Sequence, residues 1–400
     1  MTVKIFNGGA TNLYSPDNKR AHVVMTVHWD WVLYNFRLPL ARALRENGYQ
    51  VTFVCPAGHY LSKVEAEGFS CVRWKISRKS LNPFREAGSI VHLAGIYRRL
   101  KPDIVHHFCV KPNLYGTLAA SFSHVPAVIN TFTGLGYLLY DSLRARILLF
   151  FLNPFFRWAI NHPNAVVIFQ SESDRRILKE KNILASGAKV FIIPGSGVDI
   201  DRFKGKAYSG MDLQRGKKPV VLMASRLLWD KGVKEFIGMA QTLKNQGVQA
   251  EFWIAGAPDK GNPECISDSE IEKWSRQGDV KFLGHQDDIF DILSQTDIAV
   301  LPSYHEGVPR FLLEAASAGL PLIATDAGGC RMIVHDGVNG YVVPAKNVTA
   351  LAEAVGRLIN DPDLRNRMGE ASRQIAVKEF DETKIDKQFL EIYNGLQLIS

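Results

Sequence analysis

The chain has 400 residues, which is too many for one ordinary hydrophobic core, so two domains are expected. Hydrophobic residues make up 46% and charged residues 22%, as in a soluble globular protein, and no apolar run is long enough to span a bilayer. The N-terminus lacks the apolar core of a signal peptide, and five scattered cysteines without a C-x-x-C pair indicate reduced thiols in a cytoplasmic setting.

The net charge of +8 is unevenly distributed along the chain. Residues 1–198 carry +13 and residues 199–400 carry −5. Residues 73–101 alone hold eight basic residues and one acid, Glu86. This basic region suits an anionic partner such as membrane lipid, a diphosphate or nucleic acid. The alternative, a solvated face without a partner, has equal weight.

Short β-branched runs alternate with helical patterns throughout the chain, which is typical of α/β domains with parallel sheets. The predicted strands are 22–27, 50–55, 103–107, 126–131, 165–170, 189–193, 219–224, 250–255, 279–283, 297–301, 321–324 and 340–343. The clearest helical patterns are 37–47, 231–246 and 348–360.

Two successive sets of strands predict two Rossmann-like domains that face each other across a cleft, joined near PGSGVDIDRF (194–203). The predicted boundaries are 1–198 for the first domain, completed by a C-terminal helix in 380–400, and 199–379 for the second. Ligands of such sheets bind beyond the carboxyl ends of the strands, so the cleft is the expected site.

RARILLFFLNPFFRWAI (144–160) is rich in Leu, Phe and Trp and is broken by Asn153-Pro154. It is too short to span a membrane but has the composition of a segment that lies in a membrane interface. A buried crossover helix of the first domain explains it equally well.

Two cations follow a predicted strand in ASRLLWDKGVKEF (224–236). Arg226 comes directly after the strand, and Lys231 follows five residues later, where a helix is expected to begin. Arg grips a phosphate through two hydrogen bonds, and Lys adds a second positive charge. The pattern predicts a phosphate site. The alternative is a surface Arg beside a Lys231–Glu235 pair one helical turn apart.

HEGVPRFLLEAASAGLP (305–321) follows the strand that ends at Leu301. Pro309 fits the first turn of a helix, whose backbone N–H groups and dipole would favour an electron-rich group in the cleft. Glu306 precedes this helix, and Glu314 lies among its apolar residues, where burial requires hydrogen-bond donors. Ionised carboxylates only accept hydrogen bonds, and sugar hydroxyls are suitable donors.

Two cations, a helix N-terminus and two carboxylates match the diphosphate, ribose and hexose of a nucleotide-sugar. ASRLLWDKG, HEGVPRFLLEAASAGLPLIATDAGG and DGVNGYVV resemble the donor half of the family 4 glycosyltransferases, which have the GT-B fold. FRLPLARAL, SRKSLNPFRE, DIVHHFCVKPNLYGTLAA and NTFTGLGYLL are similar to a bacterial branch that adds hexose or N-acetylhexosamine to undecaprenyl-diphosphate-linked sugars. The similarity covers nearly the whole chain.

The resemblance implies a role for each matching residue. Arg226 and Lys231 would bind the donor diphosphate and stabilise it as the leaving group. Glu306 would hold hydroxyls of the transferred sugar, and Glu314 would accept hydrogen bonds from the ribose. The remaining donor-binding residues would be Gly307, Val308, Pro309 and Arg310 beside the sugar or phosphate, and Phe282 and Leu283 near the base. Transfer would retain the anomeric configuration, with no cofactor and no metal, because the chain has no convincing D-x-D metal motif.

Two segments depart from the family pattern. VHWDWVLYNFRLPLA stands where many members have a Gly-rich loop, and Thr133-Gly134 stands where many have a His-Gly that contacts the donor sugar. His106 and His107 are candidates to replace that histidine. We favour the alternative that both pack or hydrogen-bond locally at the end of a strand.

On the acceptor side the candidates are Arg37, Lys111 and Tyr115. Arg37 lies just before Pro39, and Lys111 follows strand 103–107, so either cation would meet the acceptor diphosphate. The alternative is that both are solvated charges at helix ends. The basic region and the aromatic stretch 147–158 favour a lipid-bound acceptor at the inner face of the cell membrane, with the protein bound peripherally to anionic lipid.

The sequence therefore predicts a retaining glycosyltransferase that uses a nucleotide-sugar, UDP-linked, and a polyprenyl-diphosphate-linked acceptor in bacterial surface-glycan or glycoprotein-glycan assembly. One alternative keeps the donor but uses a soluble or protein-linked glycan. Another is a non-catalytic nucleotide-sugar-binding protein of a glycan-assembly complex. Nucleic-acid binding is disfavoured because no RRM-type or zinc-finger motif is present. A dehydrogenase is disfavoured because no G-x-G-x-x-G follows the first strand.

Overall fold

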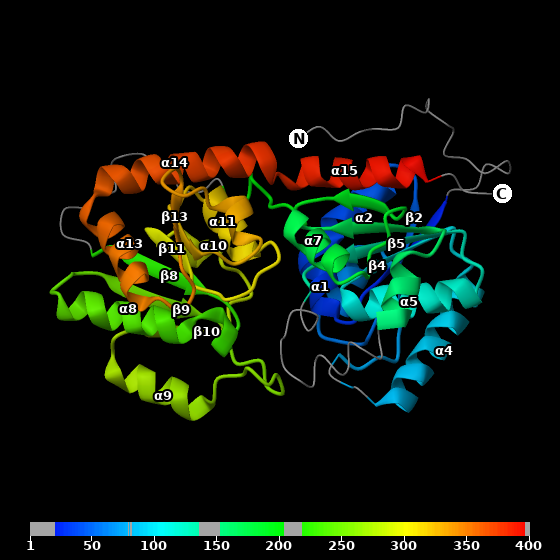
Figure 1. The fold of residues 1–400 in the computed structure, drawn as a ribbon, viewed down its shortest axis with the longest axis horizontal. Helices are drawn as coiled ribbons and strands as arrows, with labels where there is room; N and C mark the ends of the chain where they lie inside the picture. Colours follow the sequence, from blue (N-terminus) through cyan, green and yellow to red (C-terminus); the bar gives the residue numbers. More distant parts are fainter. Residues whose placement is uncertain (1–20, 79, 81, 136–152, 204–217, 397–400) are drawn as a thin grey trace. The chain divides into compact units, whose positions relative to one another are not determined.

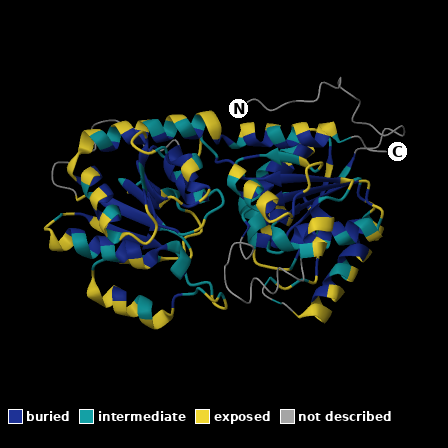
Figure 2. Cartoon of the chain, in the orientation of Figure 1, coloured by how far each residue is buried: buried dark blue, intermediate teal, exposed yellow. Residues whose placement is uncertain are grey.

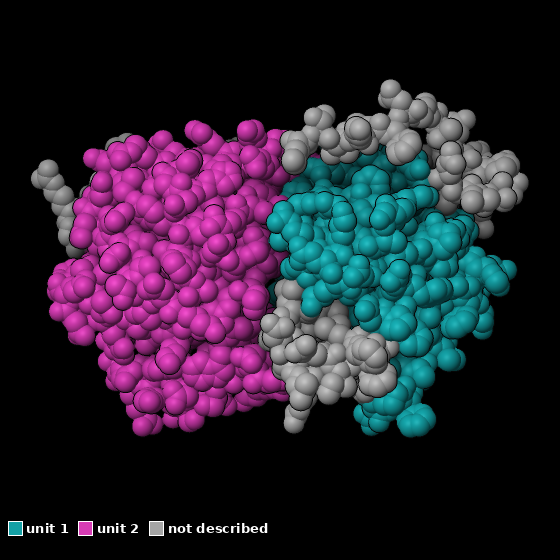
Figure 3. Space-filling model, viewed as in Figure 1, with its two compact units in different colours: residues 1–196, 385–400 teal, residues 197–384 magenta. Residues whose placement is uncertain are grey.

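The fold is that of a computed structural model, which describes residues 21–78, 80, 82–135, 153–203 and 218–396 (Figure 1). The predictions about the N-terminus (1–20), about Lys79 and about residues 144–152 of the aromatic stretch lie outside the described residues. The chain forms two compact units (Figure 3). Unit 1 is Met1–Ser196 with Ile385–Ser400, and unit 2 is Gly197–Lys384. The assignment of unit 1 to the acceptor and unit 2 to the donor stays a prediction.

Unit 1 alternates strands and helices along the sequence. In chain order its elements are β1 (His22–Thr26), α1 (Asp30–Phe36), α2 (Leu38–Glu46), β2 (Gln50–Cys55), α3 (Leu61–Ala66), β3 (Ser70–Arg73), α4 (Pro83–Leu100), β4 (Ile104–Phe108), α5 (Val110–Phe122), β5 (Ala127–Phe132), β6 (Ala165–Phe169), α7 (Glu172–Glu180) and β7 (Lys189–Ile192). The chain returns to this unit through α15 (Glu382–Gly395).

The sheet of unit 1 is parallel, with the strand order β3-β2-β1-β4-β5-β6-β7. Its strands consist mainly of buried residues (Figure 2), and the apolar side chains of both faces form hydrophobic cores. Helix α15 adds Ile385, Phe389 and Tyr393 to one of these cores. The Tyr393 hydroxyl also hydrogen-bonds His106 Nδ1 on β4 at 2.6 Å. The last helix of the chain is therefore part of the core of unit 1.

Unit 2 repeats the alternation. Its elements are β8 (Val220–Ala224), the 3₁₀ turn η2 (Trp229–Lys231), α8 (Val233–Asn245), β9 (Glu251–Ala255), α9 (Asp268–Gln277), β10 (Lys281–Gly284), α10 (Phe290–Leu293), β11 (Ile298–Leu301), α11 (Arg310–Ser317), β12 (Leu322–Thr325), α12 (Cys330–Ile333), β13 (Gly340–Val343), α13 (Val348–Asn360) and α14 (Pro362–Glu379).

The sheet of unit 2 is also parallel, in the order β10-β9-β8-β11-β12-β13, with a hydrophobic core on each face. The prediction of two parallel α/β sheets is confirmed. The strand order reverses direction between β1 and β4 in unit 1 and between β8 and β11 in unit 2. Loops that follow these strands lie where doubly wound sheets bind ligands.

Three details of the prediction are wrong. Strand β3 was not expected, because the four residues SCVR offer only a short and weak strand pattern. The helix expected from residue 231 begins at Val233, since Gly232 adopts φ +75° and separates it from the turn that contains Lys231. The helix expected from residue 37 begins at Leu38, and Arg37 is its cap.

Candidate functional site

The candidate donor residues lie on loops at the carboxyl ends of neighbouring strands in unit 2. Arg226 and Lys231 follow β8, and Glu306 follows β11, the strand paired with β8. Glu314 lies on α11, the helix that the second loop enters. Both segments follow strands that are neighbours at the strand-order reversal of this sheet.

Backbone contacts hold the two loops together. Gly232 lies so close to Pro302 that a Cβ at this position would be 2.1 Å from the Pro302 carbonyl oxygen. Two residues earlier, the Asp230 carbonyl accepts a hydrogen bond from the Tyr304 N–H at 2.8 Å. These contacts fix the position of Lys231 relative to the loop after β11.

Lys231 forms an ion pair with Glu306, with 2.8 Å between Nζ and Oε1. Both side chains are largely buried. The alternative pairing of Lys231 with Glu235 is wrong, because the Glu235 carboxylate instead accepts a hydrogen bond from the Tyr304 hydroxyl at 2.7 Å. A cation and a carboxylate from separate loops thus share one partly buried position.

Arg226 is half-exposed and donates to Asp259 at 2.7 Å. Asp259 was missed by sequence analysis, although it follows β9, the other strand paired with β8. The β9 loop packs tightly on the β8 loop, since a Cβ on Gly256 would lie 1.8 Å from the Ser225 carbonyl oxygen. The sequence did hold one signal for Asp259, because this residue follows a predicted strand.

Helix α11 buries its apolar residues as predicted, but Glu314 is only partly buried and pairs with Arg310 at 2.6 Å, one turn earlier. Pro309 is the N-cap of the helix rather than its first residue, and no side chain caps this end. The Leu312 N–H donates to the Pro309 carbonyl at 3.1 Å, and the dipole of the helix favours negative charge at this end.

A third loop contacts the backbone of the loop that carries Glu306. It follows β12, and its Gly329 N–H donates to the Glu306 carbonyl at 3.1 Å. A Cβ on Gly329 would lie 1.3 Å from the Gly307 carbonyl oxygen, so only glycine fits there. Cys330 is fully buried beside this contact. Burial raises the pKa of its thiol, and the negative charge of Glu306 raises it further.

Phe282 and Leu283 lie on the edge strand β10 and are half-buried. The pairing of β10 with β9 slips between Phe282 and Gly284, and the Gly284 carbonyl accepts from the Gly256 N–H at 2.8 Å. The end of β10, which carries Phe282 and Leu283, therefore lies near the β9 loop that carries Asp259.

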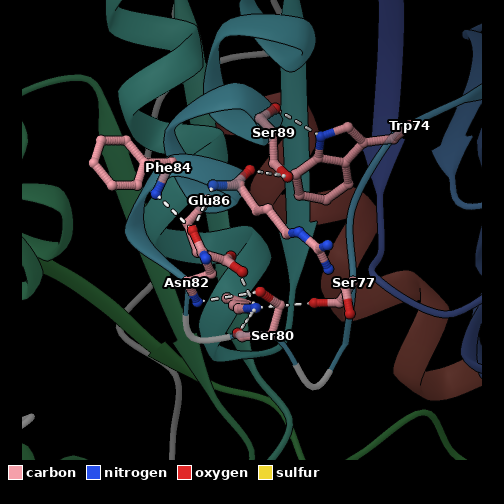
Figure 4. Close-up of polar contacts among 9 residues, drawn as sticks. Trp74, Ser77, Ser80, Asn82, Phe84, Glu86 and Ser89 are labelled. Carbon is pink, nitrogen blue, oxygen red and sulfur yellow. Dashed lines mark hydrogen bonds and ion pairs between the residues drawn. The ribbon is translucent and has the colours of Figure 1, made fainter.

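The two cationic acceptor candidates of unit 1 lie at helix ends, but their charged groups are not solvated. The alternative that they are solvated charges is therefore wrong. Arg37 is 2% exposed, and its guanidinium carbon lies 4.3 Å from the centroid of the Phe108 ring. Lys111 pairs with the buried Glu86 at 2.8 Å and donates to the carbonyls of Ser77 and Ser80 (Figure 4).

Tyr115 lies one turn after Lys111 on α5, and the Lys111 ammonium is 5.7 Å from the centroid of its ring. Burial raises the pKa of the Tyr115 hydroxyl, and so does its hydrogen bond to the Glu86 carboxylate. Lys111, Tyr115 and Glu86 therefore form one polar cluster at the start of α5.

His106 and His107 are fully buried on β4. His106 bonds Tyr393 and Thr131, and His107 bonds Tyr97 and Asn130. The interpretation that both histidines are packed locally is confirmed. Burial lowers the pKa of both, to about 4 for His107.

The described part of the chain offers neither a metal-binding cluster nor a membrane-spanning helix. No group of three or more His, Cys, Asp or Glu residues in it is arranged to hold a metal ion. None of its helices is long and apolar enough to cross a membrane.

Comparison with known proteins matches both units. The family described as "Glycosyl transferases group 1" matches residues 211–375, and "Glycosyl transferase 4-like" matches residues 14–171. A relative from Campylobacter jejuni, N,N'-diacetylbacillosaminyl-diphospho-undecaprenol alpha-1,3-N-acetylgalactosaminyltransferase, is 30% identical over 90% of this chain and 95% of its own. UDP-Gal:alpha-D-GlcNAc-diphosphoundecaprenol alpha-1,3-galactosyltransferase from Escherichia coli is 25% identical over 79% of this chain and 81% of its own.

Solved structures share the fold. The structure of Anabaena HepE in complex with UDP and glucose superposes with a TM-score of 0.74 at 20% identity, covering 94% of this chain and 99% of that one. Sucrose-phosphate synthase from Thermosynechococcus elongatus superposes with a TM-score of 0.77 at 18% identity, with the same coverage.

Proposed function

The chain belongs to the family 4 glycosyltransferases and has the GT-B fold, and on this premise we propose the reaction that it catalyses. It moves a hexose or N-acetylhexosamine from a UDP-linked nucleotide-sugar to a sugar carried on polyprenyl diphosphate, in the assembly of a bacterial surface glycan or glycoprotein glycan. The observation that carries the proposal is that Arg226, Lys231 and Glu306 lie on the loops after β8 and β11, the two strands at the strand-order reversal of unit 2.

The donor diphosphate binds to Arg226 and Lys231. Each of these cations is held by a carboxylate in the structure, Asp259 and Glu306 respectively. A diphosphate offers the same kind of hydrogen-bond acceptor as a carboxylate and carries more negative charge. It can therefore replace Asp259 as the partner of the Arg226 guanidinium, and the hydrogen bonds of Arg226 are kept. The dipole at the N-terminus of α11 also favours the negative charge of the diphosphate.

The hydroxyl groups of the donor bind to the two carboxylates. Glu306, next to Lys231, accepts from hydroxyls of the transferred sugar, and Glu314 accepts from the ribose. Arg310 pairs with Glu314 at 2.6 Å, which fixes the direction of that carboxylate. The backbone of Gly307 and Val308 lies against the transferred sugar, and Phe282 and Leu283 lie near the base.

Transfer retains the configuration at the anomeric carbon. The bond from this carbon to the phosphate oxygen breaks, the acceptor hydroxyl oxygen bonds to the carbon on the same face, and the hydroxyl proton passes to the leaving diphosphate. Arg226 and Lys231 stabilise the negative charge that develops on the diphosphate, which is the main electrostatic demand of the step. The reaction needs no metal, because these two cations supply the positive charge.

The acceptor is a lipid-linked sugar. The Campylobacter and Escherichia relatives are named for acceptors on undecaprenyl diphosphate, and they align with unit 1 as well as unit 2. Lys111 and Tyr115 remain acceptor candidates, held by Glu86. Arg37, buried against Phe108, would meet the acceptor only after a rearrangement of its loop. We place the protein at the inner face of the cell membrane as a peripheral enzyme.

The test is transfer of labelled sugar into an organic-extractable lipid fraction. Purified protein is mixed with bacterial membranes and one labelled UDP-sugar at a time, with EDTA present in a parallel series. Label in lipid for one donor, unchanged by EDTA, is expected. Hydrolysis of a UDP-sugar without lipid label would move the acceptor to a soluble or protein-linked glycan. Binding of a UDP-sugar without turnover on any acceptor would leave a non-catalytic binding protein.

A further inference from the structure

Helix α4 presents an exposed face that the fold of unit 1 does not use. Phe84 is 86% exposed and Val91 is 72% exposed. They are seven residues apart, close to two full turns, so they lie on the same side of the helix, and Arg98 continues this line by seven more. The opposite side of α4 is buried through Leu93, Ile96 and Tyr97. Phe84 and Val91 therefore contribute nothing to the core.

The end of α5 extends this face. Phe122, the last residue of α5, is 58% exposed. Arg98 donates to the Phe122 carbonyl at 3.0 Å, and the Ser123 hydroxyl donates to the Ala94 carbonyl at 3.0 Å. These bonds fix Phe122 beside the last turns of α4. We call the surface formed by the following residues the α4 face: Phe84, Arg85, Val91, Arg98, Arg99 and Phe122.

All exposed charge on α4 is positive. Arg85, Arg98 and Arg99 are exposed, and Lys101 follows as the exposed C-cap. The one acid of the helix, Glu86, is buried and pairs with Lys111 at 2.8 Å. The excess of basic residues in this region of the sequence therefore becomes an excess of positive charge on the surface.

The α4 face is also rigid. Asn82 caps the helix by accepting from the N–H groups of Phe84 and Arg85, and the Trp74 indole donates to the Ser89 carbonyl at 2.9 Å (Figure 4). The backbone that carries the apolar side chains is thus already ordered, so binding does not have to order it.

Single exposed apolar side chains are ordinary, but this arrangement is not. Of the six large hydrophobic residues that are exposed in the described part of the chain, three lie on the α4 face. Large apolar side chains among cations, on one side of a helix, match the boundary between anionic headgroups and acyl chains. We propose that the α4 face docks unit 1 on the surface of an anionic phospholipid membrane.

This inference rests on the proposed function, because a lipid-linked acceptor requires the enzyme at a membrane. It goes further by naming the face that binds. Residues 153–160 are helical and offer a competing surface, with Phe155 and Trp158 exposed beside Arg157. That surface carries a single cation over its described part, so the charge favours α4.

The test is co-flotation of the full chain with phosphatidylcholine vesicles, with and without phosphatidylglycerol. The apolar variant is Phe84→Ala with Val91→Ala, and the charge variant is Arg85→Gln with Arg99→Gln. The apolar control is Val338→Ala, at an exposed residue of unit 2. The charge control is Lys273→Gln with Arg367→Gln, also exposed in unit 2.

Wild-type protein and both controls should float with the anionic vesicles. The apolar variant should partition on the order of tenfold more weakly, from the area of Phe and Val withdrawn from lipid. For the charge variant, the partition coefficient should fall about fivefold for each cation removed, and only on anionic vesicles. Flotation of both α4 variants at the wild-type level would overturn the proposal, as would a loss that appears only with Phe155→Ala and Trp158→Ala.

A second measurement separates this inference from the proposed function. Sugar transfer is compared on a water-soluble short-prenyl acceptor and on an undecaprenyl acceptor in vesicles. The α4 variants should keep the wild-type rate on the soluble acceptor and lose rate on the vesicles. Equal rates of wild type and variants on both acceptors would overturn the α4 face and leave the transferase standing. Flotation that depends on α4, without transfer to either acceptor, would support the face and contradict the proposed function.

Discussion

At the scale of single residues, the candidate donor site is a set of ion pairs between nearby loops. Lys231 and Glu306 are 75 positions apart in sequence, and Arg226 and Asp259 are 33 apart, yet each pair is within hydrogen-bond distance. Pairing makes the site nearly neutral without ligand and orients every charged group. A nucleotide-sugar then exchanges partners with groups already in place, which lowers the cost of organising the site.

Arg226→Ala is expected to lower the transfer rate far more than it lowers stability. Its pair with Asp259 is half-exposed, so its loss should change the free energy of unfolding by less than about 1 kcal/mol. Loss of a charge that stabilises the leaving group should reduce kcat/KM on the order of a hundredfold or more. Steady-state kinetics and urea unfolding check the two parts. Lys260→Ala, on an exposed lysine, is the control. Normal kinetics for Arg226→Ala would remove Arg226 from the site.

Glu314→Gln is expected to weaken donor binding while the fold stays intact. The amide has the shape of the carboxylate but loses its charge, its pairing with Arg310 and its second acceptor oxygen for the ribose. The dissociation constant for UDP-sugar, measured by calorimetry, should rise on the order of tenfold or more. Glu353→Gln on α13 supplies an exposed control. An unchanged dissociation constant would show that the ribose binds elsewhere.

At the scale of elements, close backbone contacts keep the loops of the site in register. Gly232, Gly256 and Gly329 each lie against a carbonyl of a neighbouring loop at a distance that excludes a side chain. The loops after β8, β9, β11 and β12 therefore pack as one layer at the edge of the sheet, which provides a rigid base for charged groups that must be placed accurately.

Gly329→Ala tests this loop packing. The added methyl would displace the Glu306–Gly307 backbone, because its Cβ would lie 1.3 Å from the Gly307 carbonyl oxygen. We expect a large loss of UDP-sugar binding, with circular dichroism close to that of the wild type. Gly187→Ala is the matched control, since nothing lies within 4 Å of a Cβ at that position. Equal binding by both variants would mean that this contact does not position the site.

The strand-end pattern was enough to predict the sheets and to place the candidate donor residues on loops at the carboxyl ends of strands, because parallel strands place these ends at one edge. It did not predict Asp259, whose role depends on which strands are neighbours in the sheet. It did not predict that Lys231 pairs with Glu306 rather than Glu235, because Gly232 interrupts the helix that would have joined Lys231 to Glu235. The burial of Arg37 was also missed, since it depends on Phe108 from a distant strand.

At the scale of the whole molecule, histidines with lowered pKa values make the stability of unit 1 depend on pH, His106, His107 and His28 among them. Burial lowers the pKa of His106, His107 and His28, to about 4 for the last two, and the charges of Arg78 and Lys111 add to the effect on His28. The folded state therefore keeps these rings neutral at a pH where the unfolded chain is protonated. The contribution of these histidines to the free energy of unfolding is fully present above pH about 6.5 and is lost as the pH falls toward 4.

We expect the free energy of unfolding to fall between pH 6.5 and 4, by up to about 1.4 kcal/mol per pH unit for each histidine. Asp174 opposes this trend, because burial raises its pKa to about 6 and its folded form binds a proton more tightly than the unfolded chain. The effect of the three histidines exceeds that of the one carboxyl, so the free energy of unfolding falls on acidification. Urea unfolding across this range, with proton uptake measured on unfolding, checks the sign. A net release of protons would contradict it.

The most direct test of the central claim is a mass balance of transfer by the purified chain. The reaction contains one UDP-sugar and a defined undecaprenyl-diphosphate-linked sugar in anionic vesicles, and it follows UDP release and lipid glycosylation together. We predict one glycosylated lipid for each UDP released, with EDTA present and with the configuration at the anomeric carbon retained. UDP released without lipid product, or a product of inverted configuration, would contradict the proposed function.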